Sequence, residues 1–192
     1  MISAVVLAAG HTAEQNLFSP VDNKPVLQWV LESALDSDLD EIVCVTRDLA
    51  AVRREIRLSA RRLFWFVNPA ADRGLSTSVI AGLWASHPQS DGVMFLAGDR
   101  MPVRKELINA LIARFEQSAA LIVAPASAGQ AGGPALFRRD LFPELLDLTG
   151  NRDERALLER HAEKIALVDW PEEFFFPYLA RNKSRARLKE SL

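Results

Sequence analysis

The sequence predicts an α/β fold, in which one mostly parallel sheet lies between two layers of helices. Strand-like and helix-like segments alternate along the chain, as expected for strands joined by right-handed crossovers. The strand candidates are continuous apolar runs, which is typical of parallel strands buried on both faces. The helix candidates carry apolar residues at every third or fourth position, most clearly over residues 104–117.

In chain order, we expect strands at residues 2–8, 41–46, 63–67, 91–97, 119–124, 135–137 and 165–168. We expect helices at residues 26–35, 48–58, 75–86, 104–117, 141–148 and 152–161. Pro25 suits the first turn of a helix, and Ser76 or a neighbour is placed to cap the helix at 75–86. We expect a loop over residues 68–74, because Pro69 cannot extend a central strand, and a small-residue loop over residues 125–134.

Composition indicates one globular domain over residues 1–192, with a basic end that is frayed or solvated from about residue 180. The formal net charge of −2 provides no general attraction to nucleic acid or to an anionic membrane. The first apolar run is too short to span a bilayer, and no basic region precedes it. We therefore expect a cytoplasmic protein that binds neither nucleic acid nor membrane.

Cys44 lies inside the apolar run at residues 42–45 and is the only cysteine of the chain. A single cysteine excludes an intramolecular disulfide and a cysteine-based metal cluster, so we expect Cys44 to be a buried apolar residue. His87 and His161 have no acidic or cysteine partners at metal-ligand spacing. We expect the tryptophans to lie in the core: Trp29, Trp65, Trp84 and Trp170.

The first candidate site is the end of the opening strand, where small residues allow a ligand to approach the backbone: Leu7, Ala8, Ala9 and Gly10. Open α/β sheets bind ligands at the carboxyl ends of their strands. Backbone N–H groups at the turn, together with His11, Thr12 and Lys24, are candidate phosphate contacts. The alternative is a tight turn without a catalytic role.

A second group of polar residues surrounds the start of the helix at 75–86: Asn68, Gly74, Ser76 and Ser78. A glycine followed by serines at a helix start offers N–H and hydroxyl groups to a nucleobase edge or a phosphate. The alternative is an ordinary serine-capped helix. We expect these residues to bind a nucleotide.

Asp99 follows the predicted strand at 91–97, where a carboxylate can hold Mg²⁺ between substrate phosphates. The alternative for Asp99 is a plain turn residue, and its neighbour Arg100 can contact phosphate or pair with it. A further small-residue segment allows close approach of a second substrate: Gly132, Gly133 and Pro134. Arg152 and Arg155 follow as candidate cationic contacts or as exposed helix charges.

Taken together, these motifs resemble the MobA-like nucleotidyltransferase family, above all the molybdenum cofactor cytidylyltransferases and guanylyltransferases. Residues 7–10 match the family's L-A-A-G, and residues 24–25 match its later K-P. Residues 68–78 match N-P-x-x-x-x-G-x-S-x-S at every fixed point, and residues 81–83 match the A-G-L of the next helix. Residues 98–99 match its G-D. Residues 132–137 and 148–158 align with the G-H-P-x-L-F and L-T-G-D-x-G-A-R-x-L-L of the cytidylyltransferase branch, with Gly133 in place of the histidine.

The chain also departs from the family pattern in three places. Residues 11–19 form a shorter loop that lacks the family's arginine and first lysine, which hold the triphosphate. Pro102 stands one place later than the proline of the family's G-D-Q-P. The closing acidic motif falls on residues 172–177, where only Pro177 and Glu173 correspond to it. The run Phe174, Phe175 and Phe176 suits a core or a partner surface, because phenylalanine cannot coordinate magnesium.

The resemblance implies a three-layer Rossmann-like nucleotidyltransferase fold. It implies that Asp99 binds Mg²⁺, that Lys24 and Asp99 are catalytic, and that a nucleoside monophosphate is moved from an NTP, with CTP favoured, to a phosphorylated small molecule. Molybdopterin is the implied acceptor, and a molybdoenzyme or a second copy of the chain is the implied protein partner. The alternatives are a homologue that has lost catalysis and binds nucleotide, molybdopterin or a partner, and a sugar-phosphate nucleotidyltransferase.

Overall fold

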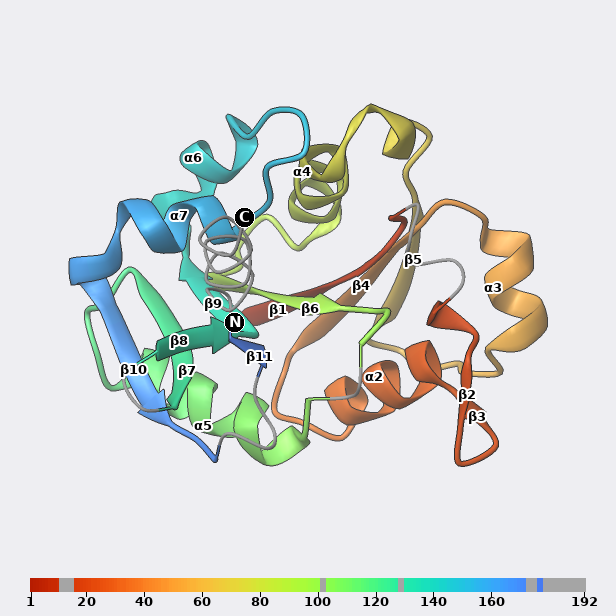
Figure 1. The fold of residues 1–192 in the computed structure, drawn as a ribbon, viewed down its shortest axis with the longest axis horizontal. Coiled ribbons are helices and arrows are strands. Elements are labelled where there is room, and N and C mark those ends of the chain that lie inside the picture. Colours follow the sequence, from red (N-terminus) through yellow and green to blue (C-terminus); the bar gives the residue numbers. More distant parts are fainter. Residues whose placement is uncertain (11–15, 101–102, 128–129, 172–175, 178–192) are drawn as a thin grey trace, which may run out of the picture.

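The computed structural model describes residues 1–10, 16–100, 103–127, 130–171 and 176–177. A 9-stranded sheet has the strand order β11-β8-β7-β9-β6-β1-β4-β5, and β10 pairs with β7 off this path. Helices lie on both faces of the sheet (Figure 1). The α/β class, the three layers and the mostly parallel sheet are therefore confirmed.

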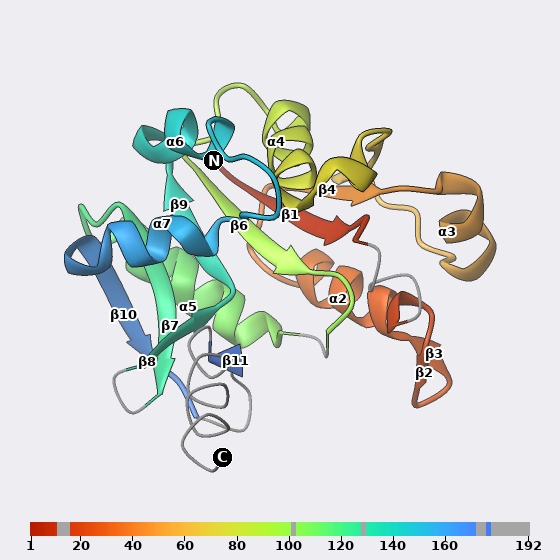
Figure 2. The same ribbon diagram turned by 45° about the horizontal axis from the view of Figure 1, so that its top comes forward.

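The parallel half of the sheet contains β6 (Gly92–Ala97), β1 (Ile2–Ala8), β4 (Glu41–Thr46) and β5 (Leu63–Val67). Leu7 of β1 pairs with Val45 on one side and with Ala97 on the other. Because these strands run in the same direction, their carboxyl ends meet at one edge of the sheet. Figure 2 shows the ends of β1 and β6 side by side between α4 and α2.

The other half is mixed. β9 (Ala135–Arg138) runs antiparallel to β6 and to β7 (Ile122–Ser127), whereas β10 (Ile165–Asp169) runs parallel to β7. β8 (Gln130–Gly133) is antiparallel to β7 and to β11 (Phe176–Pro177). The expected strand at 119–124 thus begins later and extends to Ser127, and part of the expected loop at 125–134 is strand.

Pro125 explains why the end of β7 was misplaced. A proline normally marks the end of a central strand because it lacks an N–H group. Here β7 pairs with β9 at Ile122 and Val123 and with β8 at Ala126 and Ser127. Pro125 lies between these two stretches, where β7 changes partner on that side; on its other side β7 pairs with β10, and Pro125 stands opposite Val168.

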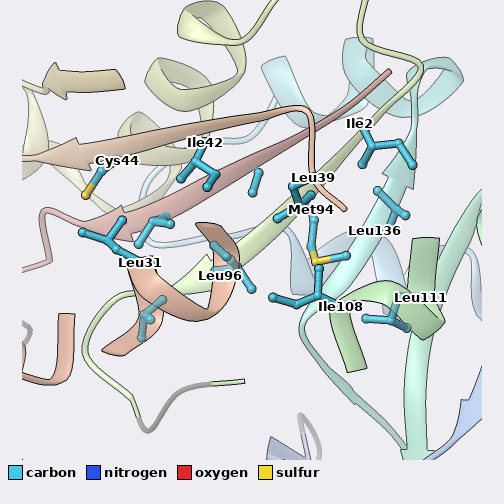
Figure 3. Packing of buried hydrophobic residues seen from close by; sticks show 14 of the residues in the cluster. Ile2, Leu31, Leu39, Ile42, Cys44, Met94, Leu96, Ile108, Leu111 and Leu136 are labelled. Atoms are coloured by element: carbon cyan, nitrogen blue, oxygen red, sulfur yellow. The ribbon is translucent and has the colours of Figure 1, made fainter. Parts of the chain in front are cut away.

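One face of the sheet packs against α2 (Val26–Leu35), α5 (Lys105–Glu116) and, through buried Val52, α3 (Leu49–Glu55). The opposite face carries α4 (Leu75–Ala85), α6 (Phe142–Leu146) and α7 (Arg155–Arg160). Alternate residues of each central strand point to the two sides, so Met94 and Leu96 contact the first core, and Val93 and Phe95 the second. Figure 3 shows the first core around Ile42, Cys44, Met94 and Ile108. Burial on both faces accounts for the unbroken apolar runs.

Several predicted helices are shorter than expected. α3 spans Leu49–Glu55 instead of 48–58, and α7 begins only at Arg155. The segment at 141–148 is a 3₁₀ turn, Arg139–Leu141, followed by α6. Further 3₁₀ turns lie at Ala71–Arg73, within the expected loop, and at Ala162–Lys164. Helix ends fray and are the part of an element that sequence periodicity locates least well.

A small hairpin lies ahead of α2, where the sequence indicated no element. It consists of β2 (Pro20–Val21) and β3 (Lys24–Pro25), joined through Asp22 and Asn23, which have φ angles of 49° and 63°. Asparagine and aspartate tolerate this left-handed conformation better than most residues do. The hairpin places Lys24 next to the start of α2.

Cys44 is fully buried, and burial raises the pKa of its thiol, so the expectation for this residue is confirmed. Trp29, Trp65 and Trp170 are half-buried, whereas Trp84 on α4 is 74% exposed. The prediction of a core position for Trp84 was therefore wrong, because its helical spacing places it on the side of α4 away from the sheet. Within the described ranges, no helix is long and apolar enough to cross a membrane.

Candidate functional site

The site is built where the carboxyl ends of β1 and β6 meet. The N–H group of Gly98 donates a 3.0 Å hydrogen bond to the carbonyl oxygen of Leu7. A Cβ atom at position 98 would stand 3.0 Å from that oxygen and 3.2 Å from both Ala8 Cβ and Leu27 Cδ1. The small residue therefore lets the turn after β6 pack directly on the end of β1, and Asp99 follows at once.

Asp99 is half-buried, and none of the described residues forms a hydrogen bond or an ion pair with its carboxylate. A carboxylate oxygen is the hard donor that Mg²⁺ prefers, and magnesium sites often use one or two carboxylates together with substrate phosphates. In the described part of the chain, no group of three or more histidine, cysteine, aspartate or glutamate side chains is arranged to hold a metal. The Asp99 carboxylate is one donor of the kind that a divalent cation takes when substrate oxygens supply its other ligands.

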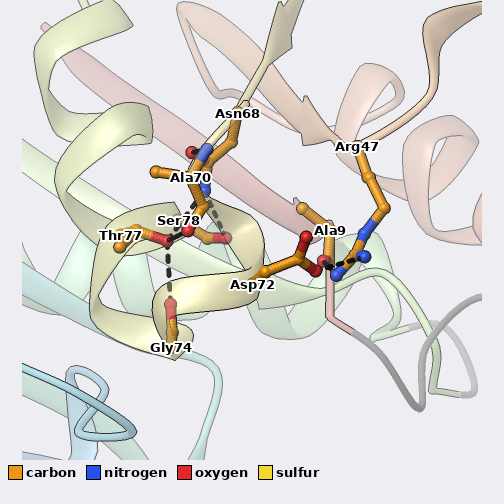
Figure 4. A network of polar contacts seen from close by, with 8 residues as sticks. All are labelled: Ala9, Arg47, Asn68, Ala70, Asp72, Gly74, Thr77 and Ser78. Carbon is orange, nitrogen blue, oxygen red and sulfur yellow. Dashed lines mark hydrogen bonds and ion pairs between the residues drawn. The ribbon is translucent and has the colours of Figure 1, made fainter.

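The cradle at residues 7–10 is lined by buried Ala8 and Ala9 and half-buried Gly10. Arg47, the residue after β4, reaches across to it: its Nη2 lies 3.5 Å from the Ala9 carbonyl oxygen. Its Nη1 forms an ion pair of 2.6 Å with Asp72 Oδ1 (Figure 4). Sequence reasoning missed Arg47, although its place directly after a predicted parallel strand was a signal.

Asn68 fixes the loop that faces the cradle. Its backbone N–H donates to Thr46 of β4 at 2.8 Å, and its side-chain oxygen accepts from the N–H of Ala70 at 3.0 Å. Its side-chain amide donates to the hydroxyls of Thr77 and Ser78, each at 3.0 Å (Figure 4). Asn68 and Ser78 are both buried. The polar groups that we expected to contact a nucleotide therefore hydrogen-bond to each other in this structure.

The start of α4 differs from the expected serine cap. The N-cap residue is Gly74, and no side chain caps the helix there. Ser76 is buried, and its N–H donates to the carbonyl oxygen of Gly150 at 3.1 Å. Gly74 has a φ of 126°, and a Cβ on it would stand 2.2 Å from that same Gly150 oxygen. The prediction of a Ser76 cap was wrong because the loop before α7 occupies this helix end.

Lys24 lies on β3, directly ahead of α2. Its Nζ is 2.5 Å from Glu32 Oε2 on α2 and 3.9 Å from the centre of the Trp29 ring. Burial by itself would raise the pKa of Glu32, but hydrogen bonds from Lys24 and Gln28 outweigh burial and lower that pKa. The ammonium of Lys24 is thus positioned by α2 in this structure.

The segment predicted to face a second substrate ends β8 and precedes β9. Gly132 and Pro134 are buried, Gly133 is half-buried, and the Gly133–Pro134 peptide bond is cis. Ala135 pairs with Phe95 in the antiparallel β6–β9 ladder. Because the two strands are antiparallel, the residues after Phe95 and the residues before Ala135 lie at the same edge of the sheet. This edge also carries Asp99.

A buried acidic group lies at the start of α7. Glu154 is 7% exposed, and its Oε2 has no hydrogen-bond partner within the part of the chain that the structure describes. Burial, followed by the neighbouring Asp153 charge, raises the pKa of Glu154 to about 7, although Arg155 and Arg100 oppose the shift. Arg155 itself binds Asp153 through Nε, at 2.9 Å from Oδ1 and 2.7 Å from Oδ2. Sequence reasoning assigned no role to Glu154.

Other proposed contacts are placed differently. Arg152 is exposed. His161 binds Glu144 at 2.9 Å, and it belongs to no group of potential metal ligands among the described residues. The remaining predicted residues lie outside the described ranges: His11, Thr12, Pro102, Glu172, Glu173, Phe174, Phe175 and the basic end at 181–189.

Comparison with solved structures returns close matches in fold. The Rv0371c protein of Mycobacterium tuberculosis H37Rv is 25% identical, with a TM-score of 0.75 and coverage of 99% of this chain and 98% of that one. Its complex with manganese matches at 26% identity, with a TM-score of 0.74 and coverage of 100% and 99%. The 4-diphosphocytidyl-2C-methyl-D-erythritol synthase of Anaerococcus prevotii DSM 20548 is 19% identical, with a TM-score of 0.73 and coverage of 100% and 96%. That last likeness is one of fold alone.

Among curated proteins, none matches the chain in sequence. The sequence profile of the MobA-like NTP transferase domain, by contrast, matches residues 4–166. This stretch contains most of β1 with its cradle, the loop from Asn68 to Gly74, Asp99 and the segment before β9. The chain therefore belongs to the family of MobA-like NTP transferase domains.

Proposed function

We propose that this protein transfers a nucleoside monophosphate from a nucleoside triphosphate, with CTP preferred, to a phosphorylated small molecule. The observation that carries the proposal is the position of Asp99, an unpartnered carboxylate among the described residues, directly beside the Leu7–Gly10 backbone. The preference for CTP rests on the segments at 132–137 and 148–158, which resemble the cytidylyltransferase branch. Molybdopterin is the acceptor that this resemblance favours.

In the proposed reaction, a phosphate oxygen of the acceptor attacks the α-phosphorus of the triphosphate. The bond between the α-phosphorus and the oxygen bridging to the β-phosphate breaks, and pyrophosphate leaves. Such catalysis depends on positioning and on neutralising charge. A divalent cation, when bound, neutralises charge on the phosphates, and the manganese complex of the Mycobacterium protein supports such an ion.

The residues of the chain contribute position and charge. Asp99 would hold the metal, and the backbone of residues 7–10 would contact the nucleotide. Asn68, Gly74, Ser76 and Ser78 would shape the opposite wall, in which Asn68 fixes the loop and Ser78 accepts its hydrogen bond. Gly132, Gly133 and Pro134 would border the acceptor. Lys24 would reach the phosphates by leaving Glu32, since both side chains are partly open to solvent.

The second candidate is a binding protein without catalytic activity. The Lys24–Glu32 ion pair of 2.5 Å favours it, because Glu32 already binds the ammonium group that we expect to contact phosphate. Calorimetric titration of CTP, GTP and ATP, each with and without Mg²⁺, followed by a pyrophosphate assay with molybdopterin, separates the candidates. Mg²⁺-dependent CTP binding with pyrophosphate release supports transfer. Binding without pyrophosphate release supports the second candidate.

The matched variants are Asp99→Asn and Asp36→Asn, the latter at the exposed end of α2. We expect Asp99→Asn to abolish the Mg²⁺ dependence of CTP binding and Asp36→Asn to leave it intact. Triphosphate binding that is absent, or that is indifferent to Mg²⁺ in the unmodified protein, would overturn the assignment of transfer.

A further inference from the structure

Among the described residues, β5 forms the edge of the sheet, and no further strand pairs with its outer side. β5 pairs with β4 on one side only: the Arg62 carbonyl accepts from Ile42 at 2.8 Å, and the Asn68 N–H donates to Thr46 at 2.8 Å. Ladder bonds between parallel strands fall on alternate residues. Positions 62, 64, 66 and 68 therefore face β4, and the backbone groups of Trp65 and Val67 point away from it. Within the described ranges, no backbone group bonds to them.

The side chains of β5 leave this edge apolar. Phe64 is 50% exposed, Phe66 is 38% exposed and Val67 is 41% exposed. Phe64 and Phe66 pair with Val43 and Val45, whose side chains pack against α4. The two phenylalanine rings therefore lie on the same face of the sheet as α4, but α4 does not cover them. Natural proteins usually protect an exposed edge with a charge, a proline or a bulge, and the sequence of β5, L-F-W-F-V, contains no charge and no proline.

Positive charge flanks this apolar edge at both ends. Four exposed arginines lie on α3 and on the connection that leads into β5: Arg53, Arg54, Arg57 and Arg61. α3 lies beside β5 (Figure 1). Arg73 is exposed beyond the other end of the strand. Arg54 binds Glu55 at 3.0 Å, whereas no carboxylate of the described residues pairs with Arg53, Arg57, Arg61 or Arg73. This charge contrasts with the net −2 of the whole chain.

We propose that the β5 edge binds an acidic, extended segment of a partner protein, which adds to the sheet as a further strand. Main-chain hydrogen bonds to Trp65 and Val67 would provide affinity, and apolar side chains of the segment would cover Phe64 and Phe66. Acidic side chains toward its ends would meet Arg61 and Arg73. The loop that begins at Asn68 continues directly from β5, so the partner would lie beside the candidate nucleotide site.

Charge argues against a second copy of this chain as the occupant. Two β5 strands paired antiparallel about Trp65 would bring Arg61 of each copy toward the segment that carries Arg73 of the other. Juxtaposed like charges disfavour an interface, whereas acidic groups in the same places favour it.

The test uses the full-length protein and fluorescein-labelled peptides in an anisotropy titration. The probe is the peptide D-E-V-Y-V-T-V-E-D, and its comparison replaces every acidic residue with lysine. A third peptide carries N-methyl groups on alternate amides, which removes the donors a strand needs. We expect saturable binding of the acidic peptide alone, weakened by salt because charge contributes. Equal binding of the lysine peptide or of the N-methylated peptide overturns the proposal, as does the absence of binding.

Variants locate the surface. We expect each of two double variants to weaken peptide binding about tenfold or more. One combines Phe64→Thr with Phe66→Thr, and the other combines Arg61→Glu with Arg73→Glu. Trp84→Thr, at an exposed aromatic residue on α4, and Arg114→Glu, at an exposed arginine on α5, serve as controls and should bind as the unmodified protein does. Circular dichroism checks folding, and β-branched threonine keeps the strand propensity of the positions that it replaces.

Light scattering examines the remaining occupant. If the protein is a dimer and the Phe64→Thr, Phe66→Thr double variant is a monomer, the edge pairs with a second copy of the chain. That result would overturn the proposal of a partner protein. CTP titration of the same variants is independent of this outcome. Nucleotide binding that survives while peptide binding is lost separates the docking surface from the proposed transfer site.

Discussion

The side-chain amide of Asn68 lies 3.0 Å from the hydroxyl of Ser78, and both residues are buried. This contact joins the residue after β5 to the first turn of α4 across a loop that contains a 3₁₀ turn. The same amide group reaches Thr77, and the Asn68 side-chain oxygen holds the N–H of Ala70. Asn68 thus organises this loop through its own hydrogen bonds within the protein.

Asn68→Ala should loosen this loop and destabilise the protein by about 2 kcal/mol, because buried polar groups lose their partner. Urea denaturation measures the change in the free energy of unfolding. Asn109→Ala is the matched control: Asn109 makes one hydrogen bond, 2.9 Å long, to the N–H of exposed Asp38, and its loss should cost about 1 kcal/mol or less. Equal losses for the two variants would contradict the clamp.

Gly74→Ala should be more damaging than Gly150→Ala. Both glycines have positive φ angles, 126° and 62°. A Cβ at position 74 would stand 2.2 Å from the Gly150 oxygen, whereas one at position 150 meets nothing within 4 Å. We expect a loss of about 3 kcal/mol or more for Gly74→Ala and of about 1 kcal/mol for Gly150→Ala, measured by thermal or urea unfolding. A reversed order would show that α4 and the loop before α7 do not pack as described.

Glu154 should make stability depend on pH. Its pKa is raised from 4.5 to about 7 in the folded protein, mainly by burial, so the folded state binds more protons than the unfolded state between these values. Stability is therefore highest below about pH 4.5 as far as this group is concerned, and it falls as the pH rises through 7. The loss is about 3 kcal/mol by pH 8, because a pKa difference of one unit corresponds to about 1.4 kcal/mol.

Glu154→Gln should remove this part of the pH dependence and stabilise the protein near pH 8. Urea unfolding near pH 5 and pH 8 measures the difference in the free energy of unfolding for each protein. Glu159→Gln, at an exposed position of α7, is the control and should keep the slope of the unmodified protein. An unchanged slope in Glu154→Gln would show that another group titrates in this range.

The sequence predicted the fold well where periodicity and burial agree. α5 lies within one residue of its predicted ends, because Leu107, Ile108, Leu111, Ile112 and Phe115 form one buried stripe. The first strands were equally clear, since burial on both faces leaves an unbroken apolar run. The partner change of β7 at Pro125 depends on β8 and β9, which are distant contacts that no local pattern contains.

The candidate site was predictable in outline and less so in its contacts. Asp99 and residues 7–10 could be placed together because parallel strands end at one edge. The pairing of Lys24 with Glu32 depends on the β2–β3 hairpin, whose two-residue strands carry little sequence signal. Arg47 meets Asp72 only because β4 and β5 are neighbours in the sheet.

Lys24 and Glu32 provide a test of the proposed phosphate contact. If Lys24 leaves Glu32 to bind the triphosphate, Lys24→Ala should weaken CTP binding about tenfold, which is about 1.4 kcal/mol. Glu32→Gln should strengthen binding or leave it unchanged, because the ammonium no longer has to leave a carboxylate. Calorimetric titration of CTP with Mg²⁺ measures both, and Lys105→Ala, at the exposed start of α5, is the control. Identical CTP affinities in all of these proteins would assign Lys24 to the packing of the hairpin on α2. A lysine that only pairs with Glu32 and Trp29 contributes to stability and not to nucleotide affinity.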